Sequence, residues 1–316
     1  MSLRIVSLLP SATEIVCALG LRDALVGVSH ECDFPADVVG LPVLTAPKLD
    51  PSRSSRDIDD DIRSLVAAGL GVYSIDTALL RELRPDLIVT QDQCDVCAVS
   101  YADVTAEVRT LATTSTEIVS LRPSRLEDVW RDIETVAAAA DVAAHGRSVA
   151  AALRARVAAL TERTSPLPRP RLACLEWLEP LMAAGNWVPD LALAAGATCS
   201  LAAPGTHSTW LEWDALAADS PDVLCAMPCG FTLLRTAADL SRLLDEVRWQ
   251  ALPAVRADRV FAVDGSSYFN RPGPRLVESA EILAAILHPA ELARLAPADA
   301  VRSVRAAAGA LLAAGG

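Results

Sequence analysis

The stretch that decides the fold is Arg4-Ile-Val-Ser-Leu-Leu-Pro-Ser-Ala-Thr-Glu-Ile-Val-Cys-Ala-Leu-Gly20. Residues 4–9 are mostly apolar and alternate little, which is typical of a buried parallel strand. After the proline, Ser11 and Glu14 have the spacing of a helix capping box. Apolar residues at helical spacing follow, and Gly20 marks the end of the helix. The stretch therefore predicts a strand, a tight turn and a helix.

The same alternation continues along the chain. Further strands are predicted at 25–29, 41–45, 86–90, 116–121, 171–175, 222–226 and 260–263, and helices at 77–83, 189–195, 211–218 and 274–287. Between the two sets, a second capping box at Ser124 and Glu127 begins one helix, and the pattern loses phase near Asp141. A helix over about 142–163 would span roughly 33 Å at 1.5 Å per residue. A proline-rich stretch, residues 165–170, ends it.

This order of elements predicts the α/β class, with two Rossmann-like lobes of parallel sheet joined by a single long helix. A chain of 316 residues also exceeds one ordinary hydrophobic core. We expect an N-terminal α/β lobe over 1–121 and a helical connection, including the long inter-lobe helix, over 122–168. The C-terminal α/β lobe is expected over 169–316.

The composition excludes several classes of function. A formal net charge of -12 disfavours binding to nucleic acid phosphates or anionic lipid. No apolar run reaches the ~18 residues of a membrane span, so direct membrane insertion is not expected. No secretory signal precedes the first strand. This indicates a cytoplasmic chain, or a periplasmic or cell-surface one if the native N-terminus has been trimmed.

Candidate binding residues follow the predicted strands, because ligands of parallel α/β sheets bind beyond the carboxyl ends of the strands. Aromatic residues make up only 4% of the chain, yet several lie in these loops beside amides and carboxylates. Such side chains give flat contact area and fix the orientation of a ligand. The predicted ligand contacts are His30, Glu31, Gln91, Asp92, Gln93, Trp177, Asn186, Trp187, Phe231, Tyr268 and Phe269.

A second set of residues has metal-binding chemistry. Cys94-x-x-Cys97, with His30 and Cys32, supplies four possible zinc ligands. A zinc ribbon would need a second C-x-x-C pair, and the sequence has none. Structural or ligand-lining cysteines, a metal site, and redox or nucleophilic chemistry all stay open. His30 is also a candidate axial ligand to cobalt or iron, or a hydrogen-bonding residue of the site wall.

Enzyme motifs are missing from the sequence. It contains no phosphate-binding G-x-x-x-x-G-K-[ST], no dinucleotide-binding G-x-G-x-x-G after a strand and no G-x-S-x-G nucleophile elbow. We therefore expect a non-enzymatic protein without a resident cofactor.

The opening stretch resembles that of the cobalamin and iron-siderophore periplasmic-binding family, the class III solute-binding proteins of ABC importers. Val26-Gly-Val-Ser-His-Glu-Cys-Asp-Phe-Pro35 is similar to the segment that follows it in that family. One segment in each half of the chain also matches the family: Leu83-Arg-Pro-Asp-Leu-Ile-Val89 in the first half and Ala218-Asp-Ser-Pro-Asp-Val-Leu224 in the second. The cysteine-bearing segments look like those of a signal-less, cobalamin-binding-like branch.

The resemblance implies a ligand held between two lobes and docking to importer membrane subunits through acidic residues. Asp76 and Asp214 lie near the docking positions, where the family usually has glutamates. The leading hypothesis is thus a solute-binding protein that holds a corrinoid, or a related tetrapyrrole or metal chelate, for ABC-type import or intracellular handling. The alternative is a zinc- or thiol-dependent enzyme or metal-handling protein that uses Cys94, Cys97, Cys32 and His30. A third hypothesis is an interaction module with an empty cleft.

Overall fold

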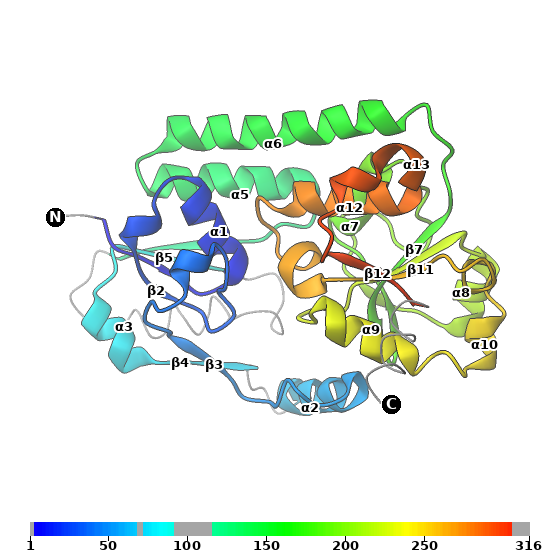
Figure 1. Ribbon diagram of the computed structural model, residues 1–316. Coiled ribbons are helices and arrows are strands. Elements are labelled where there is room, and N and C mark those ends of the chain that lie inside the picture. The colour runs from blue at the N-terminus through cyan, green and yellow to red at the C-terminus, as the bar shows by residue number, and fades with distance from the viewer. Residues whose placement is uncertain (1–2, 68–71, 92–115, 305–316) are drawn as a thin grey trace. The chain divides into compact units, whose positions relative to one another are not determined.

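The computed structural model describes residues 3–67, 72–91 and 116–304 of the chain. The chain divides into two compact α/β units: residues 1–123 with 127–153, and residues 124–126 with 154–316. Figure 1 labels the elements of both. The long helix α6 (Ala143–Thr164) continues from one unit into the other, since the boundary falls after Leu153. The predicted fold class, two α/β lobes joined by one long helix, is confirmed.

The first unit contains a sheet of four parallel strands in the order β2-β1-β5-β6. These strands are β1 (Ile5–Ser7), β2 (Leu25–Val28), β5 (Leu87–Gln91) and β6 (Glu117–Leu121). Val6 pairs with Ile88 at the centre of the sheet, and both side chains are buried. Because the strands are parallel, residues that follow β1, β2 and β5 lie at one edge of the sheet.

The helix α1 (Pro10–Ala18) follows β1 as expected, but its predicted capping box is wrong. Helix α1 begins at Pro10, and its N-cap residue Leu9 makes no side-chain cap hydrogen bond. Proline suits the first helical position because its φ angle is already helical and its missing N–H is not needed there. Ser11 and Glu14 therefore lie inside the helix, and both are buried.

The predicted strand at 41–45 is displaced. Val43 forms only a parallel bridge to Val28, and the strand β3 (Thr45–Pro47) pairs antiparallel with β4 (Tyr73–Ile75). The helix α3 (Thr77–Leu83) follows β4 and has the predicted bounds. Leu44 and Leu80 pack with Val6 and Ile88 in one hydrophobic core.

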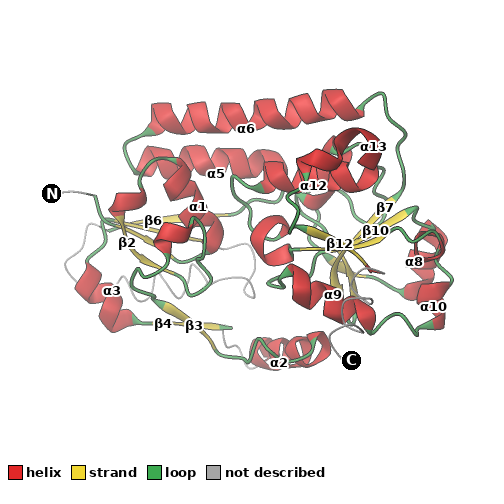
Figure 2. Ribbon diagram, viewed as in Figure 1, coloured by secondary structure: helices red, strands yellow, loops and turns green. Residues whose placement is uncertain are grey.

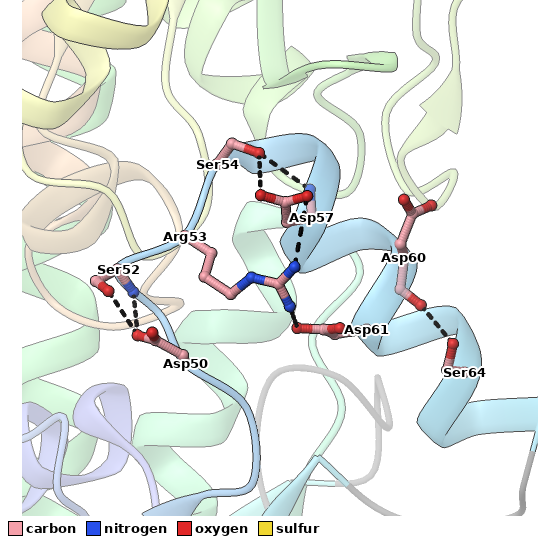
Figure 3. Close-up of polar contacts among 8 residues, drawn as sticks. All are labelled: Asp50, Ser52, Arg53, Ser54, Asp57, Asp60, Asp61 and Ser64. Carbon is pink, nitrogen blue, oxygen red and sulfur yellow. Dashed lines mark hydrogen bonds and ion pairs between the residues drawn. The ribbon is translucent and has the colours of Figure 1, made fainter.

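The helix α2 (Ser55–Ala67), which the sequence analysis does not predict, lies between β3 and β4 along the chain. Figure 3 shows how side-chain contacts organise its first turns. Ser54 accepts a hydrogen bond from the Asp57 backbone N–H and donates one to the Asp57 carboxylate. Arg53 forms ion pairs with Asp57 and with Asp61 one turn further on. The many charges of this helix hide its apolar face from a simple reading of the sequence.

The helix α5 (Leu126–Ala139) comes close to α6 at Gly146. Asp141 adopts a left-handed conformation in the turn between the two helices, with φ at 58°. A Cβ atom on Gly146 would lie 2.2 Å from the Cβ of Ala137. The absence of a side chain at Gly146 thus lets the two helices approach closely.

The second unit contains six strands in the order β12-β11-β10-β7-β8-β9. The strands β7 (Leu172–Leu178), β10 (Val223–Ala226) and β11 (Val260–Val263) are parallel, as predicted. The strands β8 (Leu181–Ala183), β9 (Thr209–Trp210) and β12 (Val301–Ser303) pair antiparallel, so this sheet is mixed. Only Glu179 and Pro180 separate β7 from β8. A connection this short can form a hairpin but not a parallel crossover.

The helices of the second unit begin and end close to their predicted positions, where predictions exist. They are α7 (Val188–Ala194), α8 (Trp213–Asp219), α9 (Leu233–Ser241), α10 (Val247–Gln250), α11 (Pro253–Arg256), α12 (Leu276–Leu287) and α13 (Pro289–Leu292). Figure 2 shows this mixture of helices and strands. Trp249 on α10 is buried in the core with Leu224 and Leu240. No described helix is long and apolar enough to cross a membrane.

Candidate functional site

In the first unit, the candidate site begins with His30, which follows β2. We use the name His30 group for His30, Thr45 at the start of β3 and Tyr73 at the start of β4. The backbone N–H of His30 donates to Thr45 Oγ1 at 3.0 Å, and the imidazole Nδ1 lies 2.6 Å from the same oxygen. The His30 and Tyr73 rings have centroids 5.3 Å apart and an interplanar angle of 49°. Three segments thus fix one imidazole at the strand edge.

Burial lowers the pKa of His30 below its ordinary value. The ring is therefore neutral at pH 7, since a histidine in water already loses its proton near pH 6.5. A neutral imidazole can act as a hydrogen-bond donor, a hydrogen-bond acceptor or a metal ligand.

Behind the His30 group lies a chain of buried polar side chains. The Thr13 hydroxyl on α1 donates to Ser7 Oγ at 2.8 Å, and Ser7 donates to the carbonyl of Leu9. Cys32 Sγ lies 3.1 Å from Thr13 Oγ1. The predicted metal ligand Cys32 is thus engaged with a hydroxyl. Among the described residues, no group of three or more His, Cys, Asp or Glu side chains could hold a metal ion.

The remaining predicted residues of this unit lie at the same edge or outside the described residues. Glu31 is partly buried, and its backbone N–H donates to Ser29 Oγ at 3.2 Å. Gln91 is the last residue of β5 and is buried. Asp92, Gln93, Cys94 and Cys97 lie outside the residues that the structure describes. Their roles as ligand contacts or metal ligands stay predictions.

In the second unit, the rings of Trp177 and Phe231, both predicted ligand contacts, pack on each other, and Phe231 is buried. Trp177 is in the last part of β7, and its ring centroid lies 5.1 Å from that of Phe231, which follows β10. The Arg235 guanidinium on α9 lies 3.9 Å from the centroid of the Phe231 ring. We use the name ring cluster for Trp177, Phe231 and Arg235. The Trp177 indole N–H is buried and has no hydrogen-bond partner among the described residues.

Backbone hydrogen bonds join the loops that carry the ring cluster. The Cys229 N–H donates to the carbonyl of Glu176, and the Ser266 N–H donates to the carbonyl of Phe231 at 3.0 Å. Asn270, further along the same loop as Ser266, donates from its amide to the carbonyl of Met227 at 2.9 Å. The carboxyl ends of β7, β10 and β11 are thereby tied into one surface.

Tyr268 lies in the short π-helix η3 (Gly265–Phe269), which follows β11. Its side chain is partly buried, and the Arg275 guanidinium lies 5.4 Å from the ring centroid. Burial raises the pKa of Tyr268 above its ordinary value, so the phenol is protonated at neutral pH and can donate a hydrogen bond.

Trp187 and Phe269 are also brought together, but inside the protein. The Trp187 indole N–H donates to the carbonyl of Phe269 at 2.9 Å, and both side chains are buried. This favours a role in holding the loop over direct contact with a ligand. The neighbouring Asn186 is partly exposed, with φ at 51°, and its backbone N–H donates to the carbonyl of Thr206 at 2.6 Å.

The two predicted docking residues are both exposed. Asp76 is the N-cap of α3, and its carboxylate accepts a hydrogen bond from the Leu79 N–H at 2.9 Å. Asp214 lies in the first turn of α8. Asp76 thus has a structural function in addition to any contact with a partner.

Sequence reasoning missed Thr45, Tyr73, Arg235 and Arg275. Thr45 and Tyr73 are 28 residues apart, in two antiparallel strands whose pairing the sequence analysis did not predict. The two arginines lie on or beside helices that follow predicted strand ends, which was the available signal. Their position over aromatic rings depends on side-chain packing that a sequence pattern does not specify.

Comparisons with known proteins agree with this architecture. A family model described as periplasmic binding protein matches residues 5–266. A solute-binding protein from Staphylococcus epidermidis, described as possibly iron-binding, has a TM-score of 0.69 at 18% identity and covers 90% of this chain and 98% of its own. The periplasmic vitamin B12 binding protein BtuF of Vibrio cholerae has a TM-score of 0.63 at 22% identity, with 91% and 97% covered. The periplasmic heme-binding protein RhuT from Roseiflexus has a TM-score of 0.68 at 22% identity, with 92% and 100% covered. No curated protein matches the sequence.

Proposed function

The chain belongs to the periplasmic binding protein family, and on that premise we propose that it reversibly binds a flat metal chelate, a corrinoid or a related tetrapyrrole. The observation that carries this proposal is the ring cluster. Trp177 and Arg235, both partly exposed, pack on the buried Phe231 ring at the carboxyl ends of parallel strands, so Trp177 and Arg235 are the members that a ligand can touch. Ligands of α/β sheets bind at such ends.

The chemistry of the ring cluster suits a flat ligand with polar edges. Aromatic side chains contact a planar macrocycle over a large area at low entropic cost. Arg235 and Arg275 add donors for the amide, carboxylate or phosphate groups on the edge of such a ligand. Vitamin B12 and heme, the ligands named for two of the structural relatives, are both flat metal chelates.

A titration tests this proposal. Purified chain is titrated with cobalamin, cobinamide and haem, followed by absorbance. We expect saturable binding of at least one of the three at micromolar concentration. Trp177→Ala should weaken it roughly tenfold, the typical cost of truncating a central aromatic contact.

Trp213→Ala is the matched control. Trp213 is also a partly buried tryptophan of the second unit, but it packs against Trp249 and Arg248. This variant should lose stability and keep the affinity of the wild-type chain. Equal losses of affinity in both variants, or no saturable binding by wild type, would count against the proposal.

We propose that the chain delivers its ligand to the membrane subunits of an ABC importer, with Asp76 and Asp214 as docking residues. Their exposure and the family membership support this. Asp214→Lys should lower ligand uptake in a reconstituted importer and leave ligand affinity unchanged. Unchanged uptake would argue against docking through Asp214.

The zinc- or thiol-dependent alternative gains no support from the family or from the solved relatives. It depends on Cys94 and Cys97, which lie outside the described residues. Elemental analysis of the purified chain, with Cys94→Ser as the control, tests it directly.

A further inference from the structure

The Thr45 hydroxyl makes two contacts with a single residue. It accepts a hydrogen bond from the His30 backbone N–H at 3.0 Å and lies 2.6 Å from His30 Nδ1. Thr45 is only 6% exposed, so water does not readily replace either contact. The direction of the second hydrogen bond decides which nitrogen of the imidazole carries the proton.

Proton counting gives that direction. A hydroxyl group has one proton to donate, and a buried donor without an acceptor is costly. Within the part of the chain that the structure describes, His30 Nδ1 is the only acceptor recorded for the Thr45 hydroxyl. The hydroxyl therefore donates to Nδ1. Because burial keeps the imidazole neutral at pH 7, its single N–H is on Nε2.

The rest of the His30 group holds the ring in place. Tyr73 packs on the imidazole at 5.3 Å between ring centroids. Among the described residues, Nε2 neither forms a hydrogen bond nor counts among the buried polar atoms without a partner. The oriented Nε2–H is thus available to a molecule bound at the carboxyl end of β2.

Building on the proposed function, we infer that His30 is a specificity-determining residue whose Nε2–H donates a hydrogen bond to an acceptor oxygen of a chelate bound at the carboxyl end of β2. A carbonyl or carboxylate oxygen on the edge of the macrocycle is the chemistry that fits. In this tautomer Nε2 does not coordinate a metal as an axial ligand, because a coordinating nitrogen must be unprotonated. Thr45 is the positioning residue that sets this choice.

Long-range ¹H–¹⁵N NMR spectra of the full chain without ligand test the tautomer. We expect the spectrum of neutral His30 to show the Nε2–H form in wild type and in Thr45→Ser, which keeps the hydroxyl. Thr45→Val removes the donor and should shift the population towards Nδ1–H. An Nδ1–H form in wild type would overturn the inference even if Thr45→Val did not fold.

Binding titrations with haem and cobinamide test the contact with the ligand. His30→Gln retains a side-chain N–H donor and should stay within about threefold of wild type, whereas His30→Ala should bind roughly tenfold more weakly. The metal-sensitive absorption bands should be the same in the wild-type and His30→Gln complexes. Bands typical of histidine ligation in wild type that disappear in both variants would overturn the inference. A wild-type chain that binds none of cobalamin, cobinamide and haem would refute the proposed function, while the tautomer would still be read from the ligand-free spectra.

Discussion

At the scale of single residues, Asp132 on α5 is an ionisable group in a poorly hydrated place. Burial, and secondarily the nearby charge of Asp128, raise the pKa of Asp132 to about 7. One of its carboxylate oxygens is buried without a hydrogen-bond partner among the described residues. Ionisation of this carboxyl therefore costs the folded state more than the unfolded state.

We expect Asp132→Asn to stabilise the chain at pH 8. A carboxyl whose pKa is raised on folding contributes stability below its unfolded value, near 4, and loses it as the pH rises through about 7. The gain should be about 1 to 4 kcal/mol at pH 8 and should shrink towards pH 4. Denaturant unfolding of both chains across this range measures it. A gain that is independent of pH would contradict the assignment.

Two histidines have the opposite effect to Asp132 on the pH dependence of stability, because they destabilise the folded chain at acidic pH. Burial lowers the pKa of both His30 and His288. Because the unfolded chain binds protons at these positions more readily, stability should fall as the pH drops below about 6.5. Thermal unfolding of wild type between pH 8 and pH 5 should show this decline, and His288→Gln should reduce it. If the stability of His288→Gln declined with falling pH as steeply as that of wild type, His288 would not contribute to the decline.

At the scale of elements, α3 depends on its N-terminal cap. The Asp76 carboxylate accepts the Leu79 N–H, and the Asp76 backbone joins the helix to Leu44 in the core. Asp76→Ala should cost about 1 kcal/mol of unfolding free energy, whereas Asp76→Asn keeps an accepting oxygen and should cost less. Urea unfolding of the three chains checks this. Equal losses in both variants would show that charge, and not capping, is the important property.

The pair of helices α5 and α6 depends on Gly146. A Cβ atom there would collide with Ala137 at 2.2 Å, so Gly146→Ala should destabilise the chain by about 1 to 3 kcal/mol despite the better helix propensity of alanine. Ala137→Gly added to this variant removes the colliding methyl group and should recover part of the loss. Additive effects in the double mutant would contradict a direct contact.

How far the sequence predicts these elements depends on local signals. The strand β11 and the helix α3 have the predicted bounds because apolar runs and turn residues frame them. The helix α2 was missed since its charged residues dominate the pattern, and the strands β8 and β9 are too short to show any period. Ser11 was misassigned because proline at the first helical position replaced the expected cap.

In the candidate site, too, the sequence predicts which residues lie near strand ends but not which side chains touch. Placing aromatic residues after strands selected both Trp177 and Phe231 as candidate ligand contacts but did not predict that their rings pack on each other. It did not separate partly exposed rings from buried ones such as Phe269, since burial depends on packing of the whole loop. Thr45 could not be linked to His30 from the sequence, because that contact requires the displaced strand β3.

At the scale of the whole molecule, two α/β units joined by α6 and the family membership fit a chain that binds a solute. Anything that binds the folded chain and not the unfolded one stabilises it by mass action. A bound chelate at 100 times its Kd should raise the free energy of unfolding by about 2.7 kcal/mol. Calorimetric scans with and without cobinamide or haem should show the corresponding rise in Tm, and Trp177→Ala should reduce it.

The central claim is reversible binding of a flat metal chelate, and equilibrium dialysis tests it most directly. The wild-type chain is dialysed against cobalamin, cobinamide and haem over a range of concentrations, and the retained ligand is measured from its absorbance. We predict that at least one of them saturates at one molecule per chain with a micromolar or lower Kd and is lost again on dialysis against buffer. Retention that rises linearly with concentration for all three, without saturation, would contradict the account.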